Sequence, residues 1–294
     1  MTKLKHYKKE ILSFLIPAIV VCAVLLLVIP KAQPLLGKVS KEKQPDTKVE
    51  FVAIGDSLTE GVGDTTEEGG YVPLLKKALI EETVLKSVGT ENFGKKGDTT
   101  KQIIDRIGSD LGIQKAIKSA DFITLTVGGN DLMAVITKEL TNHLDKETFV
   151  EPGKKYIADL TELYEMIRQF NPNAPIYQLG IYNPFNLSFS DISEFKDIVT
   201  NWDKQAQAAM EKQKNIHFVE INEELSNGRN DLKEDTKKEG NSQEFSIDTL
   251  KEEETKNNLI STEDNFHPNN LGYQLIANRF KEVIVKNTPE WDVK

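Results

Sequence analysis

The fold of this chain is constrained most by a regular alternation of short apolar segments and longer amphipathic segments between residues 49 and 285. Five of the short segments are rich in β-branched and aromatic residues, which favour strands. The predicted strands are 48–54, a weaker one within 84–93, 121–127, 174–179 and 216–221. Apolar residues at helical spacing predict helices near 70–85, 99–107, 113–119, 131–141, 154–170, 191–213 and 269–285. Such an alternation forms βαβ units, so we expect one α/β domain, a three-layer α/β/α sandwich with a parallel five-stranded sheet.

An uninterrupted apolar segment precedes this domain. Residues 11–30 are twenty consecutive positions without a charge, enough for a helix of about 30 Å that crosses a bilayer. Four lysines precede the segment, so the positive-inside rule places residue 1 in the cytoplasm and the rest of the chain outside. The predicted order is a basic tail (1–10), a transmembrane signal anchor (11–30), a flexible stalk (31–48) and the α/β domain (49–290). Cleavage as a signal peptide is the alternative, although no A-x-A-like site follows the segment.

The charges are distributed unevenly along the chain. The formal net charge is −9, but residues 1–48 hold nine lysines and three acids, whereas residues 49–294 hold 28 basic and 43 acidic side chains. This asymmetry is typical of a basic end that faces a membrane and an acidic body. The acidic body disfavours nucleic-acid binding through phosphate neutralisation. The single cysteine, Cys22, lies within the apolar segment, which excludes a disulfide framework.

Residues able to carry chemistry follow the ends of several predicted strands. Gly55-Asp-Ser-Leu58 follows the first strand, Asn92–Thr99 the second, and Gly128-Gly-Asn-Asp131 the third. Asp264-Asn-Phe-His267 follows the fifth strand, beyond a long polar segment. Ligands of open α/β sheets bind at the carboxyl ends of the strands. We therefore expect a hydroxyl, a glycine turn, a carboxamide, a carboxylate and an imidazole to meet on one rim.

These groups are the components of an acyl-transfer site. A serine is a poor nucleophile until a base takes its proton, and His267 is the candidate base for Ser57, oriented by Asp264. The backbone N–H groups of Ser57 and Gly97 and the side-chain amide of Asn130 are candidate donors to an oxyanion. Each motif alone has a structural explanation, because a serine before a helix is usually a cap and a D-x-x-H pattern arises by chance. Asp56 is expected to brace its turn through backbone hydrogen bonds.

Taken together, the four segments resemble the sequence blocks of the GDSL, or SGNH, hydrolase family. The blocks are GDSL at 55–58, NFGKKGDT at 92–99, GGND at 128–131 and DNFH at 264–267. The resemblance covers residues 49–285 and implies a flavodoxin-like three-layer α/β/α sandwich. It also implies that Ser57 is the nucleophile, that Gly97 and Asn130 complete the oxyanion hole, and that Asp264 and His267 finish the triad as acid and base.

The predicted function is that of a serine esterase or acylhydrolase outside the membrane, similar to secreted lipase/acylhydrolases of Gram-positive bacteria. Its expected partners are an ester-containing lipid or an acylated cell-wall substrate, and the membrane itself through residues 11–30. A carbohydrate O-acetylesterase is the alternative enzyme, and a surface binding protein without turnover is the alternative outside enzymes. No metal-ligand cluster or phosphate-binding loop is evident, so no cofactor is expected. Lys95 and Lys96 depart from the family pattern and either contact an anionic substrate group or face water.

Two polar segments, 142–153 and 226–263, interrupt the alternation of strands and helices. The second holds ten acidic and six basic residues, and a connection of this length within a compact domain is either functional or a flexible insertion. Because it enters directly before Asp264, we expect it to overhang the crevice and to gate access for bulky substrates. The alternative is a solvated loop with one short helix near 248–256.

Overall fold

The computed structural model describes residues 48–83, 85–139, 147–183, 193–228 and 257–288. All of them belong to a compact unit that spans residues 45–294. None of the helices in these ranges is both long enough and apolar enough to cross a membrane. The predicted anchor, 11–30, and most of the predicted stalk lie outside the described residues.

Five parallel strands form the central sheet, as the alternation predicted. They are β1 (Lys48–Gly55), β2 (Ser87–Gly94), β3 (Phe122–Thr126), β4 (Ile176–Leu179) and β5 (Ile216–Val219). Their order across the sheet is β2-β1-β3-β4-β5. The chain therefore leaves β1 toward one edge and returns to β3 on its other side, which creates a topological switch point between β1 and β3. Gly55, the last residue of β1, is in register with Thr126 of β3 and with Gly94 of β2.

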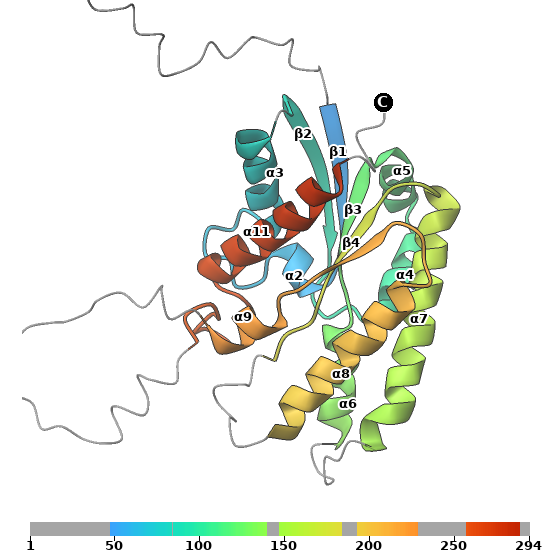
Figure 1. The fold of residues 1–294 in the computed structure, drawn as a ribbon, viewed down its shortest axis with the longest axis vertical. Helices are drawn as coiled ribbons and strands as arrows, with labels where there is room; N and C mark the ends of the chain where they lie inside the picture. The colour runs from blue at the N-terminus through green and yellow to red at the C-terminus, as the bar shows by residue number, and fades with distance from the viewer. Residues whose placement is uncertain (1–47, 84, 140–146, 184–192, 229–256, 289–294) are drawn as a thin grey trace, which may run out of the picture. The chain divides into compact units, whose positions relative to one another are not determined.

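Helices cover both faces of this sheet, so the described residues form three layers (Figure 1). Side chains of a strand alternate between its faces, and β1 shows this clearly because Val52 and Ile54 pack into one apolar cluster while Phe51 and Ala53 pack into the other. The first layer contains α4 (Thr100–Ser109), α5 (Leu111–Ser119), α6 (Gly129–Glu139), α7 (Val150–Phe170) and α8 (Ser193–Met210). The second contains α3 (Tyr71–Glu82), α9 (Asn222–Asn227) and α11 (Asn270–Lys286). A short helix, α2 (Ser57–Glu60), follows β1.

Parts of the two predicted insertions pack into the domain. Within 142–153, residues 147–149 form a 3-10 turn and α7 begins at Val150, because Phe149 and Gly153 are buried and provide packing between the polar residues. Within 226–263, Leu259 and Ile260 are buried, and Ile260 pairs with Pro268 in an antiparallel bridge. Residues 229–256 lie outside the described residues, as do the short helix predicted near 248–256 and most of the segment expected to gate the crevice.

Both ends of the segment 229–256 are held at one place on the domain. The side-chain amide of Asn257 donates to the carbonyl of Leu225 over 2.6 Å, at the end of α9. A Cβ atom on Gly228 would lie 2.9 Å from Oδ1 of Asn258, so the two ends are in contact. The chain therefore leaves and re-enters the domain at the same point, and Asp264 is separated from that point by residues that belong to the body.

Candidate active site

The nucleophile candidate lies in a tight turn between β1 and α2. Asp56 caps α2, and its Oδ1 accepts hydrogen bonds from the backbone N–H of Leu58 (3.0 Å) and from the hydroxyl of Thr126 (2.8 Å). Burial raises the pKa of Asp56, although the hydrogen bonds from Thr126 and Leu58 oppose the rise. Asp56 therefore braces the turn, as expected, and presents Ser57 as the first residue of α2.

The close approach of β3 explains the glycine that precedes this turn. A Cβ atom on Gly55 would lie 2.2 Å from Oγ1 of Thr126, which no relaxation of the backbone accommodates cheaply. The same Oγ1 contacts Oγ1 of Thr59 in α2 over 2.8 Å. The hydroxyl of Thr126 thus connects β3 to Asp56, directly before Ser57, and to Thr59, two residues after it. Sequence reasoning did not single out Thr126, because a threonine in a strand is unremarkable by itself.

Three of the predicted residues form one line of hydrogen bonds. Nε2 of His267 lies 2.9 Å from Oγ of Ser57, and Nδ1 lies 2.5 Å from Oδ2 of Asp264. A carboxylate only accepts hydrogen bonds, so the ring proton lies on Nδ1 and Nε2 is left to accept the serine proton. Burial alone would raise the pKa of Asp264, but hydrogen bonds from the His267 side chain and from two backbone N–H groups hold it below its usual value. Asp264 therefore stays ionised beside the imidazole.

The loop that carries Asp264 and His267 is fixed on several sides. The backbone N–H of Ser261 donates to the carbonyl of His267 (2.8 Å), next to the bridge between Ile260 and Pro268. The hydroxyl of Tyr182, which follows β4, donates to the carbonyl of Phe266 (2.6 Å). Asn265 adopts a left-handed conformation with φ of 51°, which asparagine tolerates better than most residues. The imidazole loop is consequently held by the segment that follows β4 as well as by its own contacts.

The predicted oxyanion donors lie around the same turn. Gly97 has φ of +83°, and a Cβ atom built there meets nothing within 4 Å, so this position requires glycine for its conformation and not for space. Asn130 lines the same pocket as Ser57, and its Nδ2 donates one hydrogen to the carbonyl of Asp98 (2.9 Å), which leaves the second available. The N–H of Ser57 lies in the first turn of α2, where N–H groups have no acceptor within the helix.

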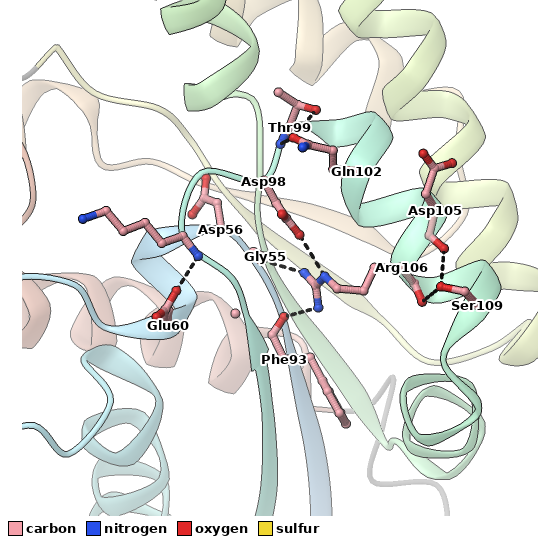
Figure 2. A network of polar contacts seen from close by, with 12 residues as sticks. Gly55, Asp56, Glu60, Phe93, Asp98, Thr99, Gln102, Asp105, Arg106 and Ser109 are labelled. Atoms are coloured by element: carbon pink, nitrogen blue, oxygen red, sulfur yellow. Dashed lines mark hydrogen bonds and ion pairs between the residues drawn. The ribbon is translucent and has the colours of Figure 1, made fainter.

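Arg106, which sequence reasoning missed, connects the end of β1, the end of β2 and the loop that carries Gly97 (Figure 2). The Arg106 guanidinium, on α4, donates to Oδ2 of Asp98 (2.8 Å), to the carbonyl of Phe93 (2.9 Å) and to the carbonyl of Gly55 (3.1 Å). A basic residue on an amphipathic helix usually faces solvent, so nothing in the sequence distinguished Arg106. Lys95 and Lys96 are exposed.

A largely apolar pocket adjoins Ser57. One face of α6 supplies Leu132, Met133 and Ile136, and further apolar side chains come from the end of β4 and from α8: Leu179, Ile181, Tyr182 and Val199. The polar residues that line it are Asp56, Ser57, Thr126, Asn130 and Asn183. Such a pocket accommodates an apolar group next to a carbonyl that reacts at Ser57.

A buried carboxyl group supports the wall of this pocket. Oδ1 of Asp203, on α8, accepts from the backbone N–H of Ile181 over 2.9 Å, and Oδ2 has no hydrogen-bond partner among the described residues. Burial raises the pKa of Asp203 to about 8. Asp203 is therefore protonated at neutral pH and behaves as a neutral hydrogen-bonding group.

Another histidine, His217 of β5, is part of the sheet. It stacks on the ring of Tyr177, with centroids 5.2 Å apart, as a structural residue does. In the part of the chain that the structure describes, no group of three or more His, Cys, Asp and Glu side chains is placed to hold a metal ion.

This chain is similar to known lipases and acylhydrolases. Residues 53–275 match the model of the GDSL-like Lipase/Acylhydrolase family. The chain is 32% identical to YpmR of Bacillus subtilis over 250 residues, which cover 84% of this chain and 87% of that protein. It is also 32% identical to the spore germination lipase LipC of Bacillus licheniformis over 140 residues, 47% of this chain and 65% of LipC, less than two thirds of that lipase.

The fold is likewise similar to that of a solved lipase. The crystal structure of the lipase Lip_vut3 from a goat rumen metagenome superimposes with a TM-score of 0.56 at 21% identity, over 80% of this chain and 96% of that chain. At this identity the likeness concerns the fold.

The raised pKa of Asp203 predicts a specific dependence of stability on pH. An unfolded aspartate ionises near pH 4, whereas folded Asp203 ionises near pH 8. As pH rises through this window, the unfolded chain loses the proton first and the folded state loses stability. Asp203→Asn keeps an acceptor for Ile181 and does not ionise, so its free energy of unfolding should increase relative to the wild type from pH 5 to pH 8, as measured by urea denaturation. The same substitution at exposed Asp105 is the control, and equal slopes for the two variants would contradict the prediction.

Proposed function

Because this chain belongs to the GDSL-like lipase/acylhydrolase family and is a carboxylic ester hydrolase, we propose that it cleaves acyl esters through an acyl-Ser57 intermediate. The observation that carries this proposal is the line of hydrogen bonds from Asp264 through His267 to Ser57, with Nε2 of His267 2.9 Å from the serine oxygen. Membership of a family of hydrolases argues against the alternative of a surface binding protein without turnover.

In the acylation step, the oxygen of Ser57 attacks the ester carbonyl carbon while its proton passes to Nε2 of His267. Asp264, an anion beside Nδ1, stabilises the imidazolium that forms. The carbonyl oxygen gains the negative charge and is received by the N–H groups of Ser57 and Gly97 and by the free hydrogen of the Asn130 amide. The C–O bond to the alcohol then breaks, and the imidazolium gives its proton to the departing oxygen.

In the deacylation step, water replaces the alcohol and the same groups act again. His267 takes a proton from the water as it attacks the acyl-enzyme carbonyl, and the oxyanion donors receive the charge once more. Collapse of the intermediate breaks the bond to Ser57, which regains its proton from the imidazolium. The products are a carboxylic acid and an alcohol, and no group of the enzyme is consumed.

The apolar pocket supports a substrate with an acyl chain longer than acetyl. The residues of α6 that line it, together with Val199 of α8, form an apolar surface on which an acyl chain can bury its methylene groups. An ester-containing lipid fits this lining better than an O-acetylated carbohydrate does.

The sequence supports a place outside the cell for this domain. We propose that residues 11–30 anchor the chain in the membrane, since they are uncharged, follow four lysines and precede an acidic body. Protease added to intact cells should then remove the domain and spare a tag placed before residue 1. Protection of the domain in intact cells, followed by digestion after lysis, would contradict this topology.

Ser57→Ala tests the nucleophile. The variant should fold normally and lose ester hydrolysis by about 10⁴-fold or more, because the remaining groups bind the substrate but cannot form the acyl-enzyme. A fluorophosphonate probe should label the wild type and the control Ser109→Ala, but not Ser57→Ala. Turnover within tenfold of the wild type would refute the assignment of Ser57.

Met133→Trp tests the acyl pocket. The larger side chain should fill the pocket that α6 lines and lower kcat/KM for an octanoyl ester, relative to an acetyl ester, by tenfold or more, about 1.4 kcal/mol. Met166→Trp is the matched control, because Met166 is also partly buried against the same core but does not line the pocket. A wild type that prefers acetyl esters, with a ratio unchanged in Met133→Trp, would favour the O-acetylesterase instead.

A further inference from the structure

We propose that Arg106 is a positioning residue that holds the oxyanion donors in place without touching the substrate. The proposal deepens the function proposed above and rests on it. Its basis is the set of three segments that one guanidinium connects (Figure 2). These segments are the end of β1, the end of β2 and the residue that follows Gly97.

The contact with β1 links Arg106 to the nucleophile turn. The carbonyl of Gly55, two residues before Ser57, accepts from Arg106 (3.1 Å) and from the backbone N–H of Lys95 (3.0 Å). One carbonyl at the end of β1 therefore anchors both the arginine and the start of the loop that carries Gly97. This arrangement sets the spacing between the N–H of Ser57 and that of Gly97.

The contact with Asp98 links Arg106 to the other two donors. Asp98 directly follows Gly97 and is buried, with 5% of its surface exposed. Its carboxylate accepts from Arg106, while its backbone carbonyl accepts from the side-chain amide of Asn130 (2.9 Å). The backbone carbonyl of Asp98 thus fixes the orientation of the Asn130 amide, and the carboxylate of Asp98 is itself fixed by Arg106.

Residues 95–97 are not buried by packing, so polar contacts determine the position of this loop. Lys95, Lys96 and Gly97 are exposed, and the space beyond the Cα atom of Gly97 is empty to 4 Å. Hydrogen bonds fix the loop instead: from Lys95 to Gly55, from the N–H of Lys96 to the carboxylate of Glu60, and from Arg106 to Asp98. A planar guanidinium offers donors in three directions at fixed angles, and a lysine ammonium does not reproduce that geometry.

The test compares Arg106→Gln and Arg106→Lys with a matched control at Arg168. Arg168, on α7, also binds backbone carbonyls, those of Ala174 (2.6 Å) and Lys214 (2.9 Å), but these precede β4 and β5 at the opposite end of the sheet. Arg168→Gln therefore removes a similar clamp far from the site. The measurements are the melting temperature, kcat and KM on one ester, and the pH profile of kcat/KM.

Arg106→Gln should lower kcat by about 10²-fold, the order of loss expected when one oxyanion donor is lost, with KM within threefold of the wild type. Arg106→Lys should lose less and fold as the wild type does, which keeps the test valid if the glutamine variant is unstable. Both should keep the shape of the wild-type pH profile, because Asp264 and His267 are untouched. Arg168→Gln should lower the melting temperature and leave kcat within twofold.

A double variant tests whether Arg106 acts through the oxyanion site. Asn130→Ala alone should lower kcat by about 10²–10³-fold. The double variant Arg106→Gln/Asn130→Ala should lose less kcat than the product of the two single losses, by tenfold or more. Three outcomes would each overturn the proposal: multiplicative losses in the double variant, a folded Arg106→Gln variant with kcat within threefold of the wild type, or an equal loss of kcat in Arg168→Gln. A wild type that hydrolyses no ester would overturn the proposed function as well, whereas an active wild type with an indifferent Arg106 would overturn this inference alone.

Discussion

The site depends on the close approach of β1 and β3 where both strands end. Gly55 and Thr126 are in register there, and only a residue without a side chain fits against the threonine hydroxyl. That hydroxyl donates to Asp56 (2.8 Å) and so fixes the turn from which Ser57 projects. Because β1 is flanked by β2 and β3, the ends of three strands deliver the nucleophile, the glycine loop and the asparagine to one rim. The parallel topology is therefore what brings together residues that are distant in the sequence.

Aspartates in this domain perform different tasks because their surroundings differ. Hydrogen bonds from His267 and from two backbone N–H groups lower the pKa of Asp264, which keeps a negative charge beside the imidazole, where the proposed mechanism forms an imidazolium. Asp203 has one backbone donor and a buried Oδ2 without a partner among the described residues, so burial dominates and its pKa rises to about 8. The extent of burial, together with the number of donors around each carboxylate, separates the anion beside His267 from a neutral brace.

The sequence predicted the elements whose signals are local and periodic. The strands and the longer helices were recognisable from apolar spacing, and the four segments around Ser57, Gly97, Asn130 and His267 were recognisable because they follow strands. Contacts between distant residues left no such pattern, and this explains why Arg106, Thr126 and Tyr182 were missed. Polarity alone did not reveal that the end of 142–153 and the end of 226–263 pack into the domain, where single buried residues such as Phe149 and Leu259 suffice to dock a mostly polar segment. The short helices α2 and α9 were missed because four to six residues carry little periodicity.

The groups of the site come from both helical layers, and this division has a mechanical consequence. Gly97 precedes α4 and Asn130 lies in the first turn of α6, and both helices pack on one face of the sheet. His267 precedes α11, which packs on the other face. Ser57 lies between them on α2, at the end of β1. A shift of either layer against the sheet would therefore misalign the proposed base or the proposed oxyanion donors with Ser57. Each side has its own tether near the carboxyl ends of the strands: Arg106 donates to the carbonyl of Gly55 at the end of β1, and Tyr182, in the segment that follows β4, donates to the carbonyl of Phe266.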